Sequence, residues 1–208
     1  SLRREVSAQA FLWLGFTRME RAQGIAAAGG DPRAEYRAAI EEISRAIEAE
    51  PETVEAWIGR GKARTNLAGA LDDPAEADGL SEAAIADLSQ ALALDPVSEE
   101  AWVTRATLNL NRGIRLQGRG EDPTACFAAA IDDLRTLEQR TSETANLCDL
   151  RGSIYLNLGT YVGACGRSPE MRWTAAEAWF GRALALDPRE PGSWRGRGRT
   201  RRNWGEQR

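Results

Sequence analysis

Apolar residues recur at steps of three and four along four segments of this chain. Because that spacing places them on one face of a helix, each segment is predicted to be an amphipathic helix. No segment sustains the alternation of apolar and polar residues that marks a half-buried strand, so we expect an all-α protein without a sheet. The apolar stripes are Ala39, Ile40, Ile43, Ala46 and Ile47; Ala84, Ile85, Leu88, Ala91 and Leu92; Ala130, Ile131, Leu134 and Leu137; and Ala176, Trp179, Phe180, Ala183 and Leu184.

The stripes belong to a sequence repeat. The string ALALDP ends at Pro96 and occurs again at Ala183–Pro188, and a looser copy, AIEAEP, ends at Pro51. The turn position recurs after 45, 46 and 46 residues, and four later positions keep the same steps. Such a period indicates a helical repeat array. The five registers are Pro51, Pro96, Ser142 and Pro188; Trp57, Trp102, Cys148 and Trp194; Arg60, Arg105, Arg151 and Arg197; Gly61, Ala106, Gly152 and Gly198; and Asn66, Asn111, Asn157 and Asn203.

Each repeat is predicted to contain two antiparallel helices. A single pair cannot bury its apolar face alone, whereas stacked pairs can. We therefore expect one array over residues 1–208, with repeats of approximately 1–51, 52–96, 97–142 and 143–188 and the first helix of a fifth repeat at 189–208.

Capping residues predict where the helices begin. Thr53, Ser98 and Ser142 are candidate N-caps of first helices. Second helices are predicted to start at Asp31-Pro32, Asp122-Pro123 and Ser168-Pro169, because Pro suits the first helical position. In the repeat 52–96 the start is expected later, with Ser81 as the cap after a loop that contains Asp73, Pro74 and Gly79.

These registers resemble those of the tetratricopeptide (TPR) repeat family, which has Trp and a small residue in the first helix and Ala, a large apolar residue, Ala and Pro in and after the second. The segments AWIGRGKARTNLAGA and AAIADLSQALALDP show the resemblance, as do AWVTRATLNLNRG and AAIDDLRTL. The matching positions are Trp57 and Gly61 with Ala84, Leu88, Ala91 and Pro96; Trp102 and Ala106 with Ala130 and Leu134; and Gly152 and Tyr155 with Ala176, Phe180, Ala183 and Pro188.

The resemblance implies a right-handed superhelical solenoid of antiparallel helix pairs that acts as a non-catalytic protein–protein scaffold. It also implies a concave groove, lined mainly by first helices, that binds a peptide or a partner's helix. The family period is 34 residues, whereas the period here is 45 to 46. We therefore expect each helix to be longer by about one to two turns.

The recurring asparagines are candidate groove residues. Each amide can both donate to and accept from a peptide backbone, but a hydrogen bond that holds neighbouring helices together would repeat in every copy as well, and both interpretations stay open. The positions facing the groove are expected to change from mildly apolar to strongly basic along the chain: Ile58, Lys62 and Thr65; Val103, Thr107 and Leu110; Asp149, Ser153 and Leu156; Arg195, Arg199 and Arg202. The predicted partner-binding residues are Lys62, Asn66, Thr107, Asn111, Ser153, Asn157, Arg199 and Asn203.

The recurring arginines could bind an acidic partner, but pairing with a carboxylate of a neighbouring helix such as Asp87, Asp133 or Glu177 is the favoured interpretation. The tryptophans Trp13, Trp57, Trp102 and Trp179 are interpreted as packing residues.

The run Trp194–Trp204 holds five arginines between two tryptophans. It suits a further first helix, and an RNA- or phosphate-binding patch is the alternative. Because repeat arrays normally end in an atypical polar cap and this helix resembles an interior one, we expect the chain to be a piece of a longer protein. A regulatory or sensor module of a bacterial signalling enzyme, such as a Ser/Thr kinase, is therefore a second candidate function.

Composition excludes several classes of protein. The chain has no His, so the triads and metal sites that use His are absent, and we expect no enzymatic activity, cofactor or metal. A net charge of −4 argues against a general nucleic-acid or membrane-surface binder. Three Cys without a CxxC motif point to a reducing compartment, so we expect a cytoplasmic protein. The predominance of Arg over the single Lys62 suggests a bacterial source.

Overall fold

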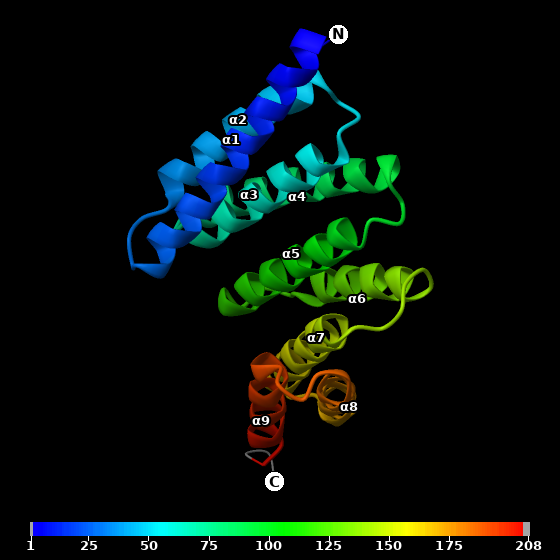
Figure 1. Cartoon of the computed structure of the whole chain (residues 1–208). Coiled ribbons are helices and arrows are strands. Elements are labelled where there is room, and N and C mark those ends of the chain that lie inside the picture. Colours follow the sequence, from blue (N-terminus) through cyan, green and yellow to red (C-terminus); the bar gives the residue numbers. More distant parts are fainter. Residues whose placement is uncertain (1, 206–208) are drawn as a thin grey trace. The chain divides into compact units, whose positions relative to one another are not determined.

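The computed structural model describes residues 2–205 of the chain, and side chains from Ala8 onward. Within that range the regular structure is entirely helical and contains no strand, which confirms the predicted all-α class. The helices, drawn in Figure 1, are α1 (Leu2–Ala27), α2 (Arg33–Ala49), α3 (Val54–Ala70), α4 (Pro74–Leu94), α5 (Glu99–Gly118), α6 (Thr124–Glu138), α7 (Ala145–Ala164), α8 (Glu170–Leu186) and α9 (Pro191–Gly205).

The chain divides into two compact units, Ser1–Leu108 and Asn109–Arg208. The first, called the N-terminal unit below, holds α1 to α4 and the first half of α5. The second, called the C-terminal unit, holds the rest of α5 and α6 to α9. That the whole chain forms one array with the repeat boundaries given above stays a prediction.

Consecutive helices form antiparallel pairs. In the first pair, Gly15 of α1 lies against Ile43 of α2, while Ala22, further along α1, shares a cluster with the earlier residue Tyr36. In the C-terminal unit, Gly152 of α7 faces Phe180 of α8 and the later Gly159 faces the earlier Trp173.

Successive pairs also stack on one another within each unit. Helix α3 packs on both α1 and α2, and α9 packs on both α7 and α8. Stacking of this kind lets each pair bury the apolar face that it cannot bury alone.

The small residue after the recurring Arg allows close packing in two of the pairs, α3 with α4 and α7 with α8. An added Cβ at Gly61 would lie 2.9 Å from Cγ of Leu88 and 3.5 Å from the carbonyl oxygen of Ala84. An added Cβ at Gly152 would lie 2.7 Å from the ring of Phe180. The distances to Leu88 and Phe180 are shorter than an unstrained carbon contact. These glycines therefore let a large side chain of the second helix lie directly on the first helix.

The start of α4 differs from the prediction. The helix begins at Pro74, and the side chain of Asp73 accepts a hydrogen bond from the backbone N–H of Ala75. Ser81 is not a cap: it is buried inside α4, and its hydroxyl donates to the carbonyl oxygen of Ala77 at 2.7 Å. Because Asp73 and Pro74 already supply the capping side chain and the fixed φ of a helix start, no second start is needed at Ser81.

The cap of α7 also differs. Thr144, not Ser142, has the extended backbone of an N-cap, and its hydroxyl accepts from the N–H of Leu147 at 3.4 Å. Other starts agree with the sequence: the Ser98 hydroxyl accepts from the N–H of Ala101 at the start of α5, and the Asp31 carboxylate accepts from the N–H of Arg33 at the start of α2.

The long period is absorbed by long helices, as predicted. The helices α3 and α4 have 17 and 21 residues, and α7 and α8 have 20 and 17. Each of these pairs alone contains more helical residues than the 34 of a complete family repeat.

Candidate binding groove

The recurring Trp closes the turn between two repeats. The indole N–H of Trp57 donates to the carbonyl oxygen of Pro51 at 2.7 Å. The same bond joins Trp102 to Pro96 at 3.0 Å, and Trp194 to Pro188 at 3.0 Å. The spacing of six residues between Pro and Trp thus has a structural cause: it places an indole donor beside a carbonyl of the turn that follows the preceding helix.

The recurring Arg contacts the indole of the recurring Trp and side chains of the two neighbouring helices, as Arg60 of α3 shows. The guanidinium of Arg60 lies 4.9 Å from the ring centroid of Trp57 and donates to both carboxylate oxygens of Asp87, at 2.7 and 3.1 Å. It also donates to the hydroxyl of Ser44 at 3.1 Å. Four such contacts leave this guanidinium no freedom to bind a partner, which supports the structural interpretation.

Two other recurring arginines have contacts of the same kind. Arg105 stacks on Trp102 at 4.9 Å and donates to Ser89 at 2.9 Å. Arg197 pairs with Glu177 at 3.0 Å, as the sequence predicts.

Arg151 is different, because Cys148 stands where the other repeats have Trp. Its guanidinium instead lies 4.5 Å from the ring of Trp179 in α8 and pairs with Glu138 of α6. Cys148 itself is buried, and burial together with the nearby Glu143 raises the pKa of its thiol to about 12.

The recurring asparagines do not share one role. Asn203 of α9 donates to the hydroxyl of Thr160 in α7 at 3.2 Å, which links two neighbouring first helices. Asn157 donates to the carbonyl of Ser153 in its own helix at 2.8 Å. Asn66 is half-buried, Asn111 is exposed, and neither amide has a hydrogen-bond partner among the described residues. Only the last two amides therefore keep all their hydrogen-bonding capacity.

Several other predicted groove residues lie between neighbouring first helices. Lys62 of α3 forms an ion pair with Glu100 of α5. In the C-terminal unit, the hydroxyl of Ser193 in α9 donates to Asp149 of α7 at 2.6 Å. Thr107 and Ser153 are half-buried, whereas Arg199 is exposed.

Three apolar groove candidates are less accessible than expected. Ile58, Leu110 and Leu156 are all buried. Leu156 belongs to an apolar cluster with residues of α8, and Ile58 belongs to one with residues of α4 and α5.

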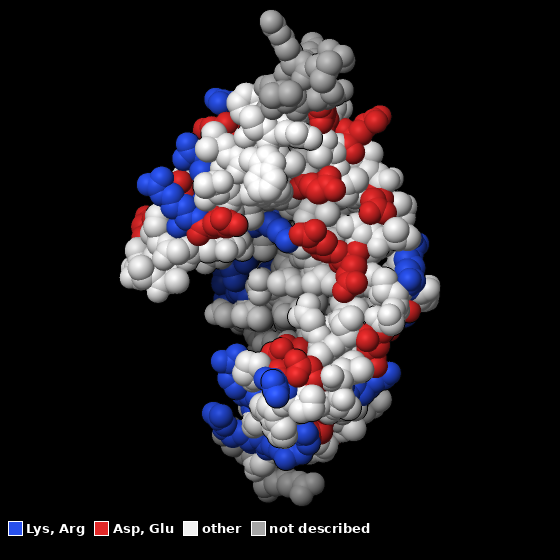
Figure 2. Space-filling view, viewed as in Figure 1, with Lys and Arg blue, Asp and Glu red and all other residues white. Residues whose placement is uncertain are grey.

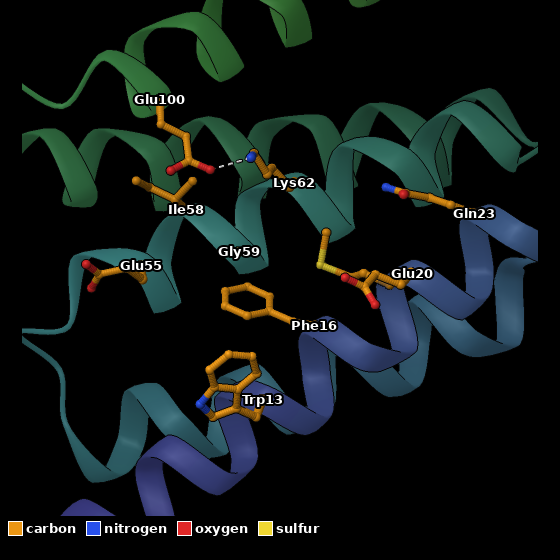
Figure 3. Close-up of a pocket in the computed structure, with 10 residues that line it drawn as sticks. Trp13, Phe16, Glu20, Gln23, Glu55, Ile58, Gly59, Lys62 and Glu100 are labelled. Atoms are coloured by element: carbon orange, nitrogen blue, oxygen red, sulfur yellow. Dashed lines mark hydrogen bonds and ion pairs between the residues drawn. The ribbon is translucent and has the colours of Figure 1, made fainter.

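A pocket of about 390 Å³ opens between α1 and α3 in the N-terminal unit. Its apolar wall is formed by Trp13, Phe16 and Met19 of α1 and by Ile58 and Gly59 of α3. Figure 3 shows the rings of Trp13 and Phe16 reaching from α1 toward the part of α3 that contains Gly59. An added Cβ at Gly59 would lie 2.5 Å from Phe16, so this glycine is what allows the ring to lie against α3.

The exposure of Trp13 contradicts its interpretation as a packing residue. Its side chain is 71% exposed, whereas Trp57, Trp102 and Trp179 are half-buried. The repeat pattern does not predict the contribution of α1 to the pocket, because α1 lies outside the Trp, Arg and Asn registers. A signal is nevertheless present in the sequence, since Trp13, Phe16, Glu20 and Gln23 follow one another at helical steps of three and four.

The polar rim of the pocket is acidic. It contains Glu20, Gln23, Glu55, Lys62 and Glu100, of which only Lys62 is basic. The expectation that this end of the groove is mildly apolar is therefore incomplete, because carboxylates surround the apolar wall.

The two units differ strongly in charge. Residues 1–108 contain 11 Arg and Lys against 19 Asp and Glu, a net charge of −8, and residues 109–208 contain 16 against 12, a net charge of +4. In the C-terminal unit, Figure 2 shows basic side chains gathered around α9. Two of its arginines, Arg197 and Arg201, are partly neutralised by Glu177.

Two kinds of site are absent from the described part of the chain. No group of three or more acidic or Cys side chains there is placed to hold a metal ion. None of the helices within residues 2–205 combines the length and the apolar character that crossing a bilayer requires.

Comparison with known proteins shows similarity in structure alone. No protein-family model matches the sequence, and no curated protein sequence is significantly similar to it. Two solved structures superpose on nearly the whole chain. The MamA protein has a TM-score of 0.62 and 16% identity, over 96% of this chain and 83% of that one. A thermophilic TPR protein from Thermus thermophilus, TTC0263, has a TM-score of 0.62 and 19% identity, over 93% and 80%. Together with the antiparallel pairs and the Trp, small-residue and Pro registers, this likeness shows that the chain has the helical-solenoid fold of the tetratricopeptide-repeat proteins.

Proposed function

We propose that this chain is a non-catalytic scaffold for protein–protein interaction that binds a peptide or partner segment along its first helices. The observation that supports this most directly is the pocket beside α1 and α3, where Trp13 is 71% exposed. An exposed indole at the mouth of an apolar pocket is costly in water, and such patches are typical of binding surfaces.

The predicted groove residues supply polar contacts for such a segment. Asn66 and Asn111 have unused amides, and Asn157 uses only its N–H₂ group, so its carbonyl oxygen remains free to accept. Amides of this kind bind a peptide backbone without regard to its side chains. The set Lys62, Asn66, Thr107, Asn111, Ser153, Asn157, Arg199 and Asn203 is retained as the proposed contact surface, with Lys62 and Asn203 also holding neighbouring helices.

A cytoplasmic scaffold without a cofactor or metal fits these features. The buried thiol of Cys148, whose pKa is raised to about 12, is not a reactive nucleophile at neutral pH. The residues with the strongest contacts, such as Arg60 and Asp87, hold helices together rather than face a pocket.

The test is capture of partners by the full chain. Immobilised wild-type protein should retain specific proteins from a lysate of the source cell, identified by mass spectrometry, and the pair Asn111→Ala and Asn157→Ala should retain them less. Asn146→Ala, an exposed asparagine of α7 outside the repeat register, is the matched control and should retain them fully. If the double variant kept its partners but unfolded at a lower temperature, these asparagines would be structural and this part of the proposal would be wrong.

The positive charge of the C-terminal unit favours a second candidate, an RNA- or phosphate-binding surface on α9. Arg195, Arg199 and Arg202 are exposed there. Electrostatic binding to phosphates is strongest at low salt, so absence of RNA binding at low salt would eliminate this candidate.

A further inference from the structure

We propose that the pocket between α1 and α3 binds a basic segment of the partner, in which an Arg or Lys lies beside a large apolar side chain. This inference rests on the proposed function and specifies the chemistry of the segment. A volume of about 390 Å³ admits one or two side chains rather than a whole helix, so the pocket takes an anchor from the segment.

Two of the three carboxylates on the rim, Glu20 and Glu55, have no counter-charge among the described side chains. Glu20 and Glu55 form no ion pair with the described residues, and Lys62 already pairs with Glu100. The arginines nearest to Glu20 along α1, Arg18 and Arg21, both pair with Glu35 of α2. A positively charged ligand would therefore complement these two carboxylates.

Glu55 also has no basic residue one turn further along its own helix. Three and four residues after it, where a helical partner would stand, are Ile58 and Gly59. Since the N-terminal unit carries a net charge of −8, its field also attracts cations and repels acidic segments over a longer range.

The indole of Trp13 makes a basic ligand side chain favourable next to the apolar anchor. A guanidinium or ammonium that lies on an exposed Trp ring gains a cation–π interaction, and Trp is the best ring for it. In Figure 3, Trp13 and Phe16 lie on the same side of the pocket, and the carboxylates of Glu20 and Glu55 lie around them. One side chain can thus contact the rings while its charged end reaches a carboxylate.

The experiment measures binding of two dye-labelled peptides, each of about ten residues, to the full chain by fluorescence anisotropy. Both peptides contain a central Leu-Phe pair in a Gly-Ser background. One flanks the pair with two arginines and the other with two glutamates. The basic peptide should bind, more weakly as salt rises, and the acidic peptide should not.

Variants locate the binding. Trp13→Ala should weaken binding of the basic peptide by about tenfold or more, because an exposed aromatic anchor is lost. The pair Glu20→Gln and Glu55→Gln should weaken it about three- to tenfold, as expected for two solvent-exposed charge contacts. The pair Glu41→Gln and Glu48→Gln is the control, because it removes the same charge from exposed positions of α2 outside the pocket. It should change binding less than about twofold.

Each other outcome overturns the inference in a distinct way. Equal weakening by the α2 control pair would mean that the general field, not the pocket, attracts the peptide. If the acidic peptide bound and Trp13→Ala weakened its binding, the scaffold function would stand, but the bound segment would be acidic and not basic. Binding of neither peptide would reject the basic segment as the occupant, while the lysate capture would still decide the scaffold function independently.

Discussion

The indole N–H of Trp102 donates a hydrogen bond to the carbonyl oxygen of Pro96, 3.0 Å away, at the junction between α4 and α5. The same ring carries the guanidinium of Arg105 on its face. Trp102 thus contacts both the turn that follows α4 and the side chain of Arg105 in α5. Its repetition as Trp57 and Trp194 shows that the junction is a standard part of the repeat.

Replacing Trp102 by Phe should destabilise the fold modestly. Phe keeps an aromatic face for Arg105 but removes the indole N–H that donates to the carbonyl oxygen of Pro96. The loss of one such bond costs about 0.5–1.5 kcal/mol of unfolding free energy. Urea unfolding followed by circular dichroism measures the change. Trp13→Phe is the control, because the Trp13 indole is exposed, and it should change the stability by less than about 0.5 kcal/mol.

Removing the buried carboxylate of Asp87 should be much more damaging. Asp87 is 2% exposed and accepts from both Arg60 and Arg64, at 2.7 and 2.5 Å. Asp87→Ala leaves two guanidinium groups without their partner in a largely buried site. Loss of one member of such a pair costs about 3–5 kcal/mol.

The matched control for Asp87 is an exposed ion pair. Asp132 pairs with Arg135 one turn away on the surface of α6. Because exposed pairs contribute about 0–1 kcal/mol, Asp132→Ala should leave the urea midpoint nearly unchanged. Equal losses for the two variants would show that Asp87 is not a specific link between α3 and α4.

Two glycines should respond to alanine with opposite signs. At Gly152 the new Cβ would lie 2.7 Å from the buried ring of Phe180, and overpacking of this kind costs about 1–3 kcal/mol. At Gly181, inside α8, nothing lies within 4 Å of the added Cβ. Only the higher helix propensity of Ala acts there, so Gly181→Ala should raise the free energy of unfolding by up to about 1 kcal/mol. Thermal unfolding of both variants measures the difference, and a stabilised Gly152→Ala would contradict the packing described for α7 and α8.

The repeat register was sufficient to predict the helices because its signals are local. Pro, the capping side chain and the apolar stripe all act within one or two turns of chain. The sequence pattern predicts the start of α4 too late, because Gly79 is typical of a loop. A glycine is tolerated inside a long helix at a cost of about 1 kcal/mol, and the hydroxyl of Ser81 is satisfied by its own helix.

The candidate site was less predictable because it depends on contacts between distant segments. The pocket forms only when α1 lies against α3, and α1 lies outside the Trp, Arg and Asn registers of the repeat. Likewise, the replacement of Trp by Cys148 redirects Arg151 to Glu138 and Trp179, two partners that its own repeat position does not indicate. The Cys at the Trp position of this repeat therefore goes with different partners for the recurring Arg, and these partners lie in other helices.

The half-buried carboxylate of Asp149 should make the stability of the chain sensitive to pH. Burial raises its pKa above the ordinary 3.8, the nearby Glu190 raises it further, and the hydroxyl of Ser193 and the charge of Arg195 lower it. In the unfolded chain the same group ionises near 3.8. Since the folded pKa is the higher one, the ionised carboxylate destabilises the folded state at pH 7, and this cost disappears as the pH falls through the raised pKa toward 3.8.

Asp149→Asn removes the charge and keeps an oxygen that can accept the hydrogen bond from Ser193. The variant should therefore be more stable than the wild type at pH 7, and its advantage should shrink as the pH is lowered toward about 4. Urea unfolding at several values between about pH 4 and pH 7 measures both effects. Asp72→Asn, whose side chain is 99% exposed, is the control that should show neither. An advantage of Asp149→Asn that stayed constant over this pH range would mean that the amide improves packing between α7 and α9 and that the charge of Asp149 carries no cost.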